Sequence, residues 1–370
     1  MDKSIPSGRQ TLVFLAGVGR GASEKAMKLA VRAAAEEATD FSWLSKADIV
    51  FIKPALNSGN TYPATTSPIA IGAMIELLKE KGAGRVIVGD MSGIEHIKLS
   101  PRGFSGSSRR LMESSGMARV VRAAGAEIHF FEEAGWKAFY EDAPAEGSYW
   151  KQGLMMPNIL KEVQHIILMP RCGRHALAGS TLGLKAAVGY WRTDTRLAYH
   201  RDASTFQEKT AEGNAVETLL KKQRFVLSAA DKILTTYGPD KGYVVEPKNG
   251  LIIASESVVA HDMVSLSWLL ENRHNVSRSE KNWLKDPYSS QFIVSMANRF
   301  LIVRKLGGWG PAFTSEKLTR NDIHAIWDDR VLNHAYKVFG GIPKVILEAA
   351  NDGVPENLKK QLSEMTTLST

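Results

Sequence analysis

Residues 47–90, ADIVFIKPALNSGNTYPATTSPIAIGAMIELLKEKGAGRVIVGD, decide the fold of this chain. The run DIVFI is apolar at consecutive positions, which predicts a strand with both faces buried, as in a parallel sheet. Ser67 and Pro68 then open a helix that Gly82 closes, and GRVIVGD predicts a second strand. A strand, a helix and a strand in this order predict a parallel unit of two strands joined by a crossover helix.

The same alternation continues in both directions along the chain. Further strands are predicted by TLVFLAG, AEIHFFE and HIILMP, and helices by SEKAMKLAVRAAAEEA and by residues 107–125. Residues 193–214 are polar and lack a clear period, so they predict a loop or lid. Asn249-Gly250 resembles the turn of a hairpin. We therefore expect a doubly wound, mostly parallel α/β sheet with helices on both faces.

The C-terminal part of the chain has a different pattern. Helices are predicted over residues 289–307 and 321–340, after the last strand-like segment. This predicts two regions: an α/β domain over residues 1–270 that carries the functional site, and a mainly helical extension over residues 271–370 packed on it.

Composition narrows the class of protein. The chain has 370 residues, of which 44% are hydrophobic and 23% charged, as in soluble globular proteins. No run approaches the roughly 20 apolar residues that cross a bilayer. The apolar run near the N-terminus is too short for a signal peptide. We expect a cytoplasmic protein without a membrane partner. The single cysteine, Cys172, excludes an internal disulfide and argues against an iron–sulfur cluster.

The charge balance points to an anionic ligand. The formal net charge is +8, but the basic residues are scattered and are not interleaved with aromatic residues. A small anionic molecule is therefore a better expected partner than nucleic acid.

Ligands of open α/β sheets bind beyond the carboxyl ends of the strands, and the loop after the DIVFI strand is rich in polar groups. Lys53 could neutralise an anion, and Asn57 supplies hydrogen-bond donors and acceptors. Thr65 and Thr66 precede a helix whose N-terminus can receive an anion. The alternative is a loop stiffened by prolines in front of a capped helix.

Other ionisable residues lie at or after strand ends. Asp90, followed by Ser92, could hold a metal or a ribose hydroxyl, or could cap the next turn. Asp262 could be a helix cap or a ligand-binding acid. His200 is a candidate for proton transfer or metal binding.

Residues 169–185, MPRCGRHALAGSTLGLK, form a glycine-rich turn after the HIILM strand. His175 could act as an acid or base, whereas Lys185 could be a base, a Schiff-base former or an anion clamp. The alternative for Lys185 is an ordinary surface lysine. Ser180 and Thr181 line the turn and could contact a cofactor, although the spacing does not match a phosphate-binding P-loop.

Several segments occur in the order seen in one family. They are DIVFIKPALNSG with YPATTSP, VIVGDMSG, AGSTLGLKAAVG, Gly238-Pro239 with Gly242, and IIASESVVAHD. This combination resembles the domain of unknown function 362 family, often labelled uncharacterised iron–sulfur centre proteins. The resemblance covers residues Ala47–Leu270.

Three positions depart from that family pattern. Ala55 stands where the first block usually has Asn, Ala186 follows the lysine where Asn is usual, and His261 precedes the aspartate where Val is usual. Many members carry cysteine quartets, whereas this chain has one cysteine, so the iron–sulfur label does not transfer.

The segment RHALAGSTLGLKAAVG followed by His200 is also similar to part of the lactate racemases that use a nickel-pincer nucleotide. That similarity implies that Lys185 anchors a cofactor or anion, that His200 ligates a metal, and that His175 is an acid or base. A divalent metal would then have Asp90, His200 and Asp262 as its candidate ligands.

Together these features favour an enzyme that acts on a small anionic substrate at the strand ends. Its chemistry would be isomerisation or redox chemistry at a carbon next to a carboxylate, with or without the assistance of a metal. The alternatives are a non-catalytic sensor or carrier of an anionic metabolite or metal and, ranked last, a nucleic-acid-binding protein.

Overall fold

The computed structural model describes residues 6–175, 178–202, 204–236, 238–277 and 323–368. The helix expected over 289–307 lies outside these residues. Within the described ranges, no helix is both long and apolar enough to cross a membrane.

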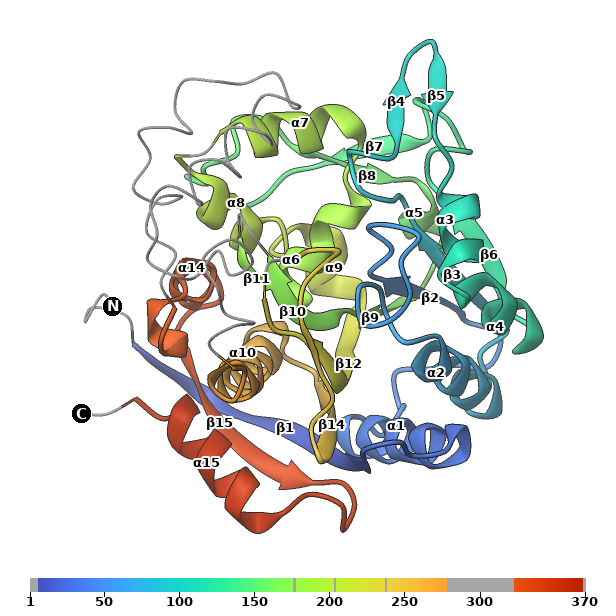
Figure 1. The fold of residues 1–370 in the computed structure, drawn as a ribbon. Helices are drawn as coiled ribbons and strands as arrows, with labels where there is room; N and C mark the ends of the chain where they lie inside the picture. The colour runs from blue at the N-terminus through green and yellow to red at the C-terminus, as the bar shows by residue number, and fades with distance from the viewer. Residues whose placement is uncertain (1–5, 176–177, 203, 237, 278–322, 369–370) are drawn as a thin grey trace.

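A large sheet forms the centre of the molecule (Figure 1). Its main strands are β1 (Ser7–Gly19), β2 (Ile49–Pro54), β3 (Arg85–Asp90), β6 (Glu127–Phe130), β9 (His165–Met169), β12 (Gln223–Leu234), β14 (Asn249–Ser255) and β15 (Ile342–Ala349). Three shorter strands extend it, β10 (Arg171–His175), β11 (Gly179–Thr181) and β13 (Val244–Val245). Two separate hairpins are formed by β4 (Lys98–Ser100) with β5 (Gly103–Ser105), and by β7 (Phe139–Asp142) with β8 (Leu154–Pro157).

The order of the main strands is β15-β1-β14-β12-β9-β2-β3-β6. On this path only β14 runs antiparallel to its neighbours. From β2 the chain continues outward to β3 and β6, and then returns to place β9 on the other side of β2. The order of the strands therefore reverses between β2 and β9, which is where open α/β sheets bind ligands.

Helices cover both faces of the sheet (Figure 1). They are α1 (Glu24–Ala38), α2 (Pro68–Glu80), α3 (Ser108–Ser114), α4 (Met117–Ala123), α5 (Ile159–Glu162), α6 (Gly183–Ala186), η1 (Ala187–Tyr190), α7 (Thr193–Arg201), α8 (Phe206–Glu212), α9 (Glu217–Lys222), α10 (Val258–His274), η2 (Ile326–Asp328), α14 (Arg330–Val338) and α15 (Glu356–Thr366). The predicted α/β fold class is confirmed.

The core follows from the alternation of side chains along each strand. In β2, Val50 and Ile52 pack against α1, α2 and α4, whereas Phe51 faces the opposite side with η1 and α7. Lys53 lies two residues after Phe51, so its side chain points to the same face of the sheet and also contacts η1. The strand therefore directs this lysine to the face on which the turn of residues 169–185 returns to the sheet.

Local structure differs from the sequence-based expectations in several places. The helix expected over 107–125 is two helices, because Gly116 between them has a φ of 81°. Residues 193–214 form α7 and α8 instead of a loop. Asn249-Gly250 is not a turn, since both residues lie in β14 and pair with β1. The described C-terminal residues also contribute β15 to the sheet, a strand that the sequence did not predict.

Candidate functional site

The candidate site lies beyond the carboxyl ends of β2, β3 and β9. The chain leaves β9 into the β10–β11 hairpin, and α6, η1 and α7 follow directly. These elements bring His175, Lys185 and His200 close enough together for their charges to interact. The three predicted catalytic residues therefore belong to one cluster.

Lys185 lies on the short helix α6, which a buried carboxylate from α10 holds in place. Asp262 accepts hydrogen bonds from the backbone N–H of Gly183 at 2.8 Å and of Leu184 at 2.7 Å. These are free donors at the start of a helix, so the carboxylate caps α6. Asp262 thus caps a neighbouring helix, whereas its sequence position suggested a cap of the helix that it opens; Ser257 caps that helix, α10.

A second buried contact fixes the capping carboxylate. Nδ1 of His261 lies 2.8 Å from Oδ1 of Asp262, and Nε2 of His261 lies 2.8 Å from the hydroxyl of Ser228 on β12. All three side chains are buried. The set resembles a serine–histidine–aspartate triad, but its side chains are buried in the core. Its role is therefore structural: it connects the sheet to the helix that carries Lys185.

The amine of Lys185 has an unusual environment for a lysine. Its Nζ lies 5.4 Å from the ring centroid of Tyr199 and 5.9 Å from that of Phe206. No described side chain or carbonyl accepts a hydrogen bond from it. Burial, assisted by the charges of Arg196 and Arg171, lowers the pKa of this amine to about 7. A lysine in this state can bind an anion, act as a base or act as a nucleophile.

The two histidines hold complementary tautomers. Nδ1 of His200 is 2.7 Å from the carbonyl oxygen of Arg196, to which it must donate, so Nε2 carries the lone pair. Nδ1 of His175 instead accepts from the backbone N–H of Ala178 at 3.2 Å, so neutral His175 carries its proton on Nε2.

Both histidines are held in the neutral form. Burial and the charge of Lys185 lower the pKa of His200 to about 3. The same two causes, with Arg171 next in importance, hold the pKa of His175 well below its usual value. At neutral pH both rings are therefore uncharged, with the lone pair of His200 on Nε2 and the ring proton of His175 on Nε2.

Arg196 connects this cluster to the end of β3. Its guanidinium donates to the carbonyl oxygens of Ser92 at 2.6 Å, of Met91 at 2.7 Å and of Gly189. Its Nε is buried and has no partner among the described residues. Burial lowers the pKa of Arg196 to about 10, so the group remains a cation.

Arg171 is a second buried cation next to the cluster. It donates to the carbonyl oxygens of Ala64 and Pro239 and thereby joins the loop after β2 to the residues after β12. Burial lowers its pKa to about 10, and Asp240 is the acid that acts against this shift. Neither Arg171 nor Arg196 was expected from the sequence to have a role in the site. The sequence signals that could have identified them are their positions: Arg171 is two residues after the end of a strand, and Arg196 is four residues before His200.

Lys53 has a different environment from Lys185. Its Nζ lies 3.0 Å from Oδ1 of Asp90, and both side chains are almost completely buried. The Asp90 carboxylate also accepts from the backbone N–H groups of Met91 at 2.8 Å and Leu56 at 2.9 Å. Lys53 therefore neutralises an acid of the protein, which is a different role from the expected contact with an anionic ligand.

The hydroxyl residues of the loop hold the loop itself. Thr66 donates to the carbonyl oxygen of Met169 at 2.6 Å, and its hydroxyl accepts from the N–H of Ala55 at 2.8 Å. Thr65 donates to the carbonyl oxygen of Asn60 at 3.0 Å. The structure thus favours the structural alternative for both threonines.

The other predicted contact residues are distributed around the site. Asn57 bonds through Nδ2 to the Asp240 carboxylate, whereas its Oδ1 and the hydroxyl of Ser92 are buried without a partner among the described residues. Ser180 and Thr181 lie in β11, opposite β10. Asn57 and Ser92 are therefore the two of these four residues with buried polar atoms still available.

The proposed metal ligands do not form one metal site. In the described part of the chain, no three or more His, Cys, Asp or Glu side chains are grouped to hold a metal. Both oxygens of Asp90 and of Asp262 are used by the contacts above. Among the described residues, His200 is the one of the three expected ligands that retains an available donor atom, and the structure does not group it with Asp90 and Asp262.

Cys172 does not belong to the chemistry of the site. Its side chain is fully buried, and Sγ contacts the carbonyl oxygen of Ser265 at 3.5 Å. Burial raises the pKa of the thiol far above its usual value, which keeps it in the unreactive protonated form.

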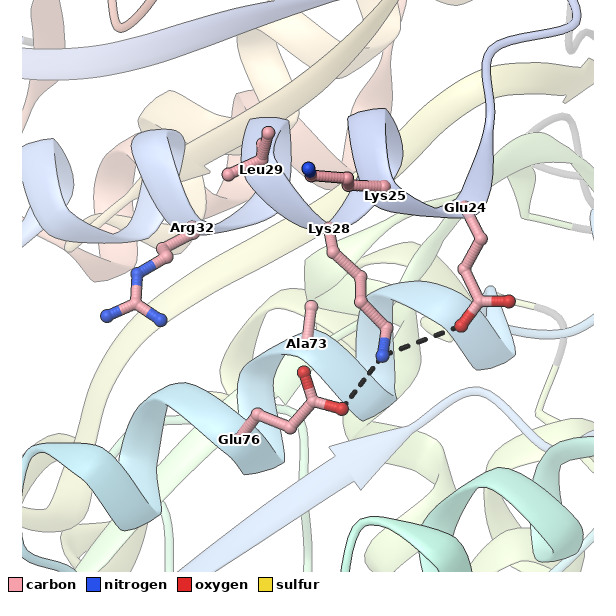
Figure 2. A pocket seen from close by; sticks show the side chains of 7 residues that line it. All are labelled: Glu24, Lys25, Lys28, Leu29, Arg32, Ala73 and Glu76. Carbon is pink, nitrogen blue, oxygen red and sulfur yellow. Dashed lines mark hydrogen bonds and ion pairs between the residues drawn. The ribbon is translucent and has the colours of Figure 1, made fainter.

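A solvent-facing groove of ≈ 390 Å³ lies elsewhere, between α1 and α2 (Figure 2). Lys28 crosses it and pairs with Glu76 at 2.8 Å and with Glu24 at 3.5 Å (Figure 2). Because ion pairs between its own side chains cross the groove, we interpret it as a contact between two surface helices and not as a ligand site.

A family model described as "Domain of unknown function (DUF362)" matches residues 50–267. A crystal structure of a Thermotoga maritima protein, a structural genomics target, is 14% identical over 64% of this chain and 55% of that one, with a TM-score of 0.40. The chain thus spans little more than half of the Thermotoga protein.

A second similar structure is the lactate racemase apoprotein from Thermoanaerobacterium thermosaccharolyticum. It is 11% identical over 97% of this chain and 86% of that one, with a TM-score of 0.42. No curated protein sequence matches the chain.

Proposed function

This chain belongs to the domain of unknown function 362 family, and we propose that it is an enzyme that binds a small anionic substrate and moves a proton on it. The observation that carries the proposal is the amine of Lys185. It lies in an apolar setting beside two neutral histidines, with no acceptor among the described residues. A lysine with a lowered pKa next to groups suited to proton transfer is typical of a catalytic site.

The surrounding charges support an anion as the substrate. Arg171 and Arg196 remain cations at neutral pH and lie near the Lys185 amine, whose own pKa they lower. Asp90 is already paired with Lys53. An incoming carboxylate or phosphate would therefore enter a field of positive charge.

The histidines would divide the proton transfer between them. An anion bound beside Lys185 would raise the low pKa of His200, and its Nε2 lone pair could then take a proton from a substrate carbon next to a carboxylate. His175, whose ring proton is on Nε2, would be the acid of the pair. Isomerisation or redox chemistry at such a carbon would use both groups.

The local resemblance to the nickel-pincer racemases implies a nucleotide cofactor tethered to the lysine and a metal bound to the later histidine. The residues present fit such a group. In the part of the chain that the structure describes, the Lys185 amine has no hydrogen-bond partner and His200 has an available Nε2, on a ring that a carbonyl orients. When bound, the group would supply a metal centre beside the substrate. The protein residues would still orient the anion and move the proton.

Proton exchange in D2O tests the proposal. Protein purified from its own host is incubated with D- and L-lactate and with D- and L-malate, and the C2 proton is followed by proton NMR. We expect loss of the C2 signal for at least one acid, slowed about 10²-fold or more in His200→Asn and His175→Ala. Native mass spectrometry and elemental analysis of the same sample show whether a metal or nucleotide-sized adduct accompanies Lys185.

The same samples distinguish the alternative function. Calorimetric binding of these acids without any exchange would support a non-catalytic binding protein. Binding and exchange that both survive Lys185→Ala would overturn the assignment of the site.

A further inference from the structure

Lys53 of β2 and Lys185 of α6 have different partners. Nζ of Lys53 is 3.0 Å from a carboxylate oxygen of Asp90. Nζ of Lys185 has no carboxylate partner among the described residues, and the rings of Tyr199 and Phe206 flank it instead. Burial lowers the pKa of both amines, but a carboxylate opposes this shift only at Lys53, so Lys185 loses its proton more readily.

An unpaired ammonium group is costly in such surroundings, so the neutral amine is favoured. A neutral amine that is desolvated and close to another cation is a strong nucleophile toward carbonyl carbons. We propose that Lys185 binds its substrate covalently, by forming an imine with the ketone carbon of a small 2-oxo acid. This inference rests on the proposed function in one respect, namely that the site receives a small anion.

The preference for an acid comes from two guanidinium groups. Arg171 and Arg196 are fully buried, and each retains a buried Nε without a partner among the described residues. A carboxylate next to the reacting carbonyl would be attracted by both charges. An uncharged ketone of the same shape would lack this attraction.

The reaction balances without a further reagent. The lone pair of Nζ attacks the carbonyl carbon, a C–N bond forms, and the C=O π electrons move to oxygen. The nitrogen then re-forms a lone pair that expels the oxygen as the C–O bond breaks and C=N forms. Both amine hydrogens leave with the oxygen as one molecule of water. Nε2 of His200 carries these protons from nitrogen to oxygen and is regenerated.

Reductive trapping tests the inference directly. The full-length protein is treated with pyruvate and sodium cyanoborohydride at pH 7, and modified lysines are identified by peptide mass spectrometry. We expect Lys185 to be labelled about tenfold or more faster than Lys25, an exposed lysine of α1 (Figure 2), because far more of its amine is neutral. Lys53, a buried lysine whose amine is paired with Asp90, should remain unlabelled.

Two controls make the result specific. Lys185→Arg should remove the fast label and leave the slow labelling of exposed lysines unchanged. Acetone, in which a methyl group replaces the carboxylate of pyruvate, should label Lys185 more slowly than pyruvate does. Labelling of Lys185 no faster than that of Lys25, or an unchanged fast label in Lys185→Arg, would overturn the inference.

Trapping does not require turnover, so its failure can be separated from failure of the proposed function. A fast label on Lys185 without proton exchange on the hydroxy acids would support the imine and contradict the enzyme assigned above. Proton exchange without the label would support that enzyme and contradict the imine.

Discussion

Nδ1 of His200 donates to the carbonyl oxygen of Arg196 at 2.7 Å, one turn earlier on α7. This hydrogen bond selects the tautomer of His200: the proton is on Nδ1, and Nε2 keeps its lone pair. Arg196 uses its guanidinium to bind the end of β3. The base of the proposed reaction is therefore oriented by a residue that is itself anchored to the sheet.

This relationship predicts a difference between two substitutions. In His200→Asn the amide N–H can replace Nδ1 as donor to Arg196, whereas His200→Ala cannot. We expect His200→Ala to lose about 1 kcal/mol of unfolding free energy relative to His200→Asn, since one hydrogen bond is lost. Both should lose proton exchange, because neither has Nε2. Urea unfolding and proton NMR measure the two effects, and exchange at the wild-type rate in His200→Asn would contradict the role of Nε2.

The lowered pKa of His200 predicts loss of stability in acid. The pKa is about 3 in the folded protein against 6.5 for an unperturbed histidine, so the unfolded chain binds the proton first as the pH falls. The unfolding free energy should therefore decrease below pH 6.5 and continue to decrease toward pH 3, by up to about 1.4 kcal/mol per pH unit from this residue. Urea unfolding between pH 7 and pH 4 measures the slope. The slope should be smaller in His200→Asn, and equal slopes would contradict the prediction.

The buried pair of Lys53 and Asp90 predicts a large effect on stability. Lys53→Met would leave a buried carboxylate without its cation, and we expect a loss of about 3–5 kcal/mol of unfolding free energy. The double variant Lys53→Met/Asp90→Leu should recover part of this loss, because no charge remains unpaired. Denaturant unfolding measures the unfolding free energies of the single and double variants, and so shows whether the second substitution recovers part of the loss. Reductive labelling of Lys185 should change little in any variant that folds.

Much of the fold was predictable because the strands near the site are apolar on both faces. DIVFI and HIILM became adjacent parallel strands, and Val50 and Phe51 do face different layers. His175, Lys185 and His200 could also be selected, because each follows a strand or a glycine turn on the same side of the sheet. The local sequence pattern, together with the rule that ligands bind beyond strand ends, was sufficient to select these three residues as site candidates.

Other features depend on contacts between distant segments. Residues 193–214 are polar, yet they form α7 and α8 because Tyr199 and Phe206 are buried against each other at a centroid distance of 4.3 Å. The hydrophobic pattern of the sequence does not predict that Arg196 is buried or that it binds the end of β3. The pairing of Lys53 with Asp90 likewise depends on the packing of β2 beside β3, and this contact removed Lys53 from the expected anion contacts.

Gly189 gives a steric test of the region between η1 and the sheet. A Cβ atom at this position would lie 2.6 Å from Oδ1 of Asp90 and would also collide with Nζ of Lys53. Gly189→Ala should therefore cost about 1–3 kcal/mol of unfolding free energy. Gly19→Ala is the matched control, since a Cβ there meets no atom within 4 Å. Thermal unfolding of both variants measures the difference, and equal stabilities would argue against this packing.

The cap of α6 predicts a coupled change in stability and reactivity. In Asp262→Asn the side chain has one acceptor oxygen in place of two, so a backbone N–H of Gly183 or Leu184 loses its partner. The expected loss is about 1–3 kcal/mol of unfolding free energy. Because α6 carries Lys185, loosening its first turn should admit water around the amine, raise its pKa and slow reductive labelling by pyruvate.

A matched control separates this coupling from general destabilisation. Ser107 caps α3 through the N–H of Arg110 at 3.2 Å, on a helix that does not carry Lys185. Ser107→Ala should lower the unfolding free energy by about 1 kcal/mol and leave the labelling rate of Lys185 unchanged. Slower labelling in Asp262→Asn alone is the result expected if the carboxylate positions Lys185. Equal labelling rates in the two variants would mean that Asp262 contributes to stability only.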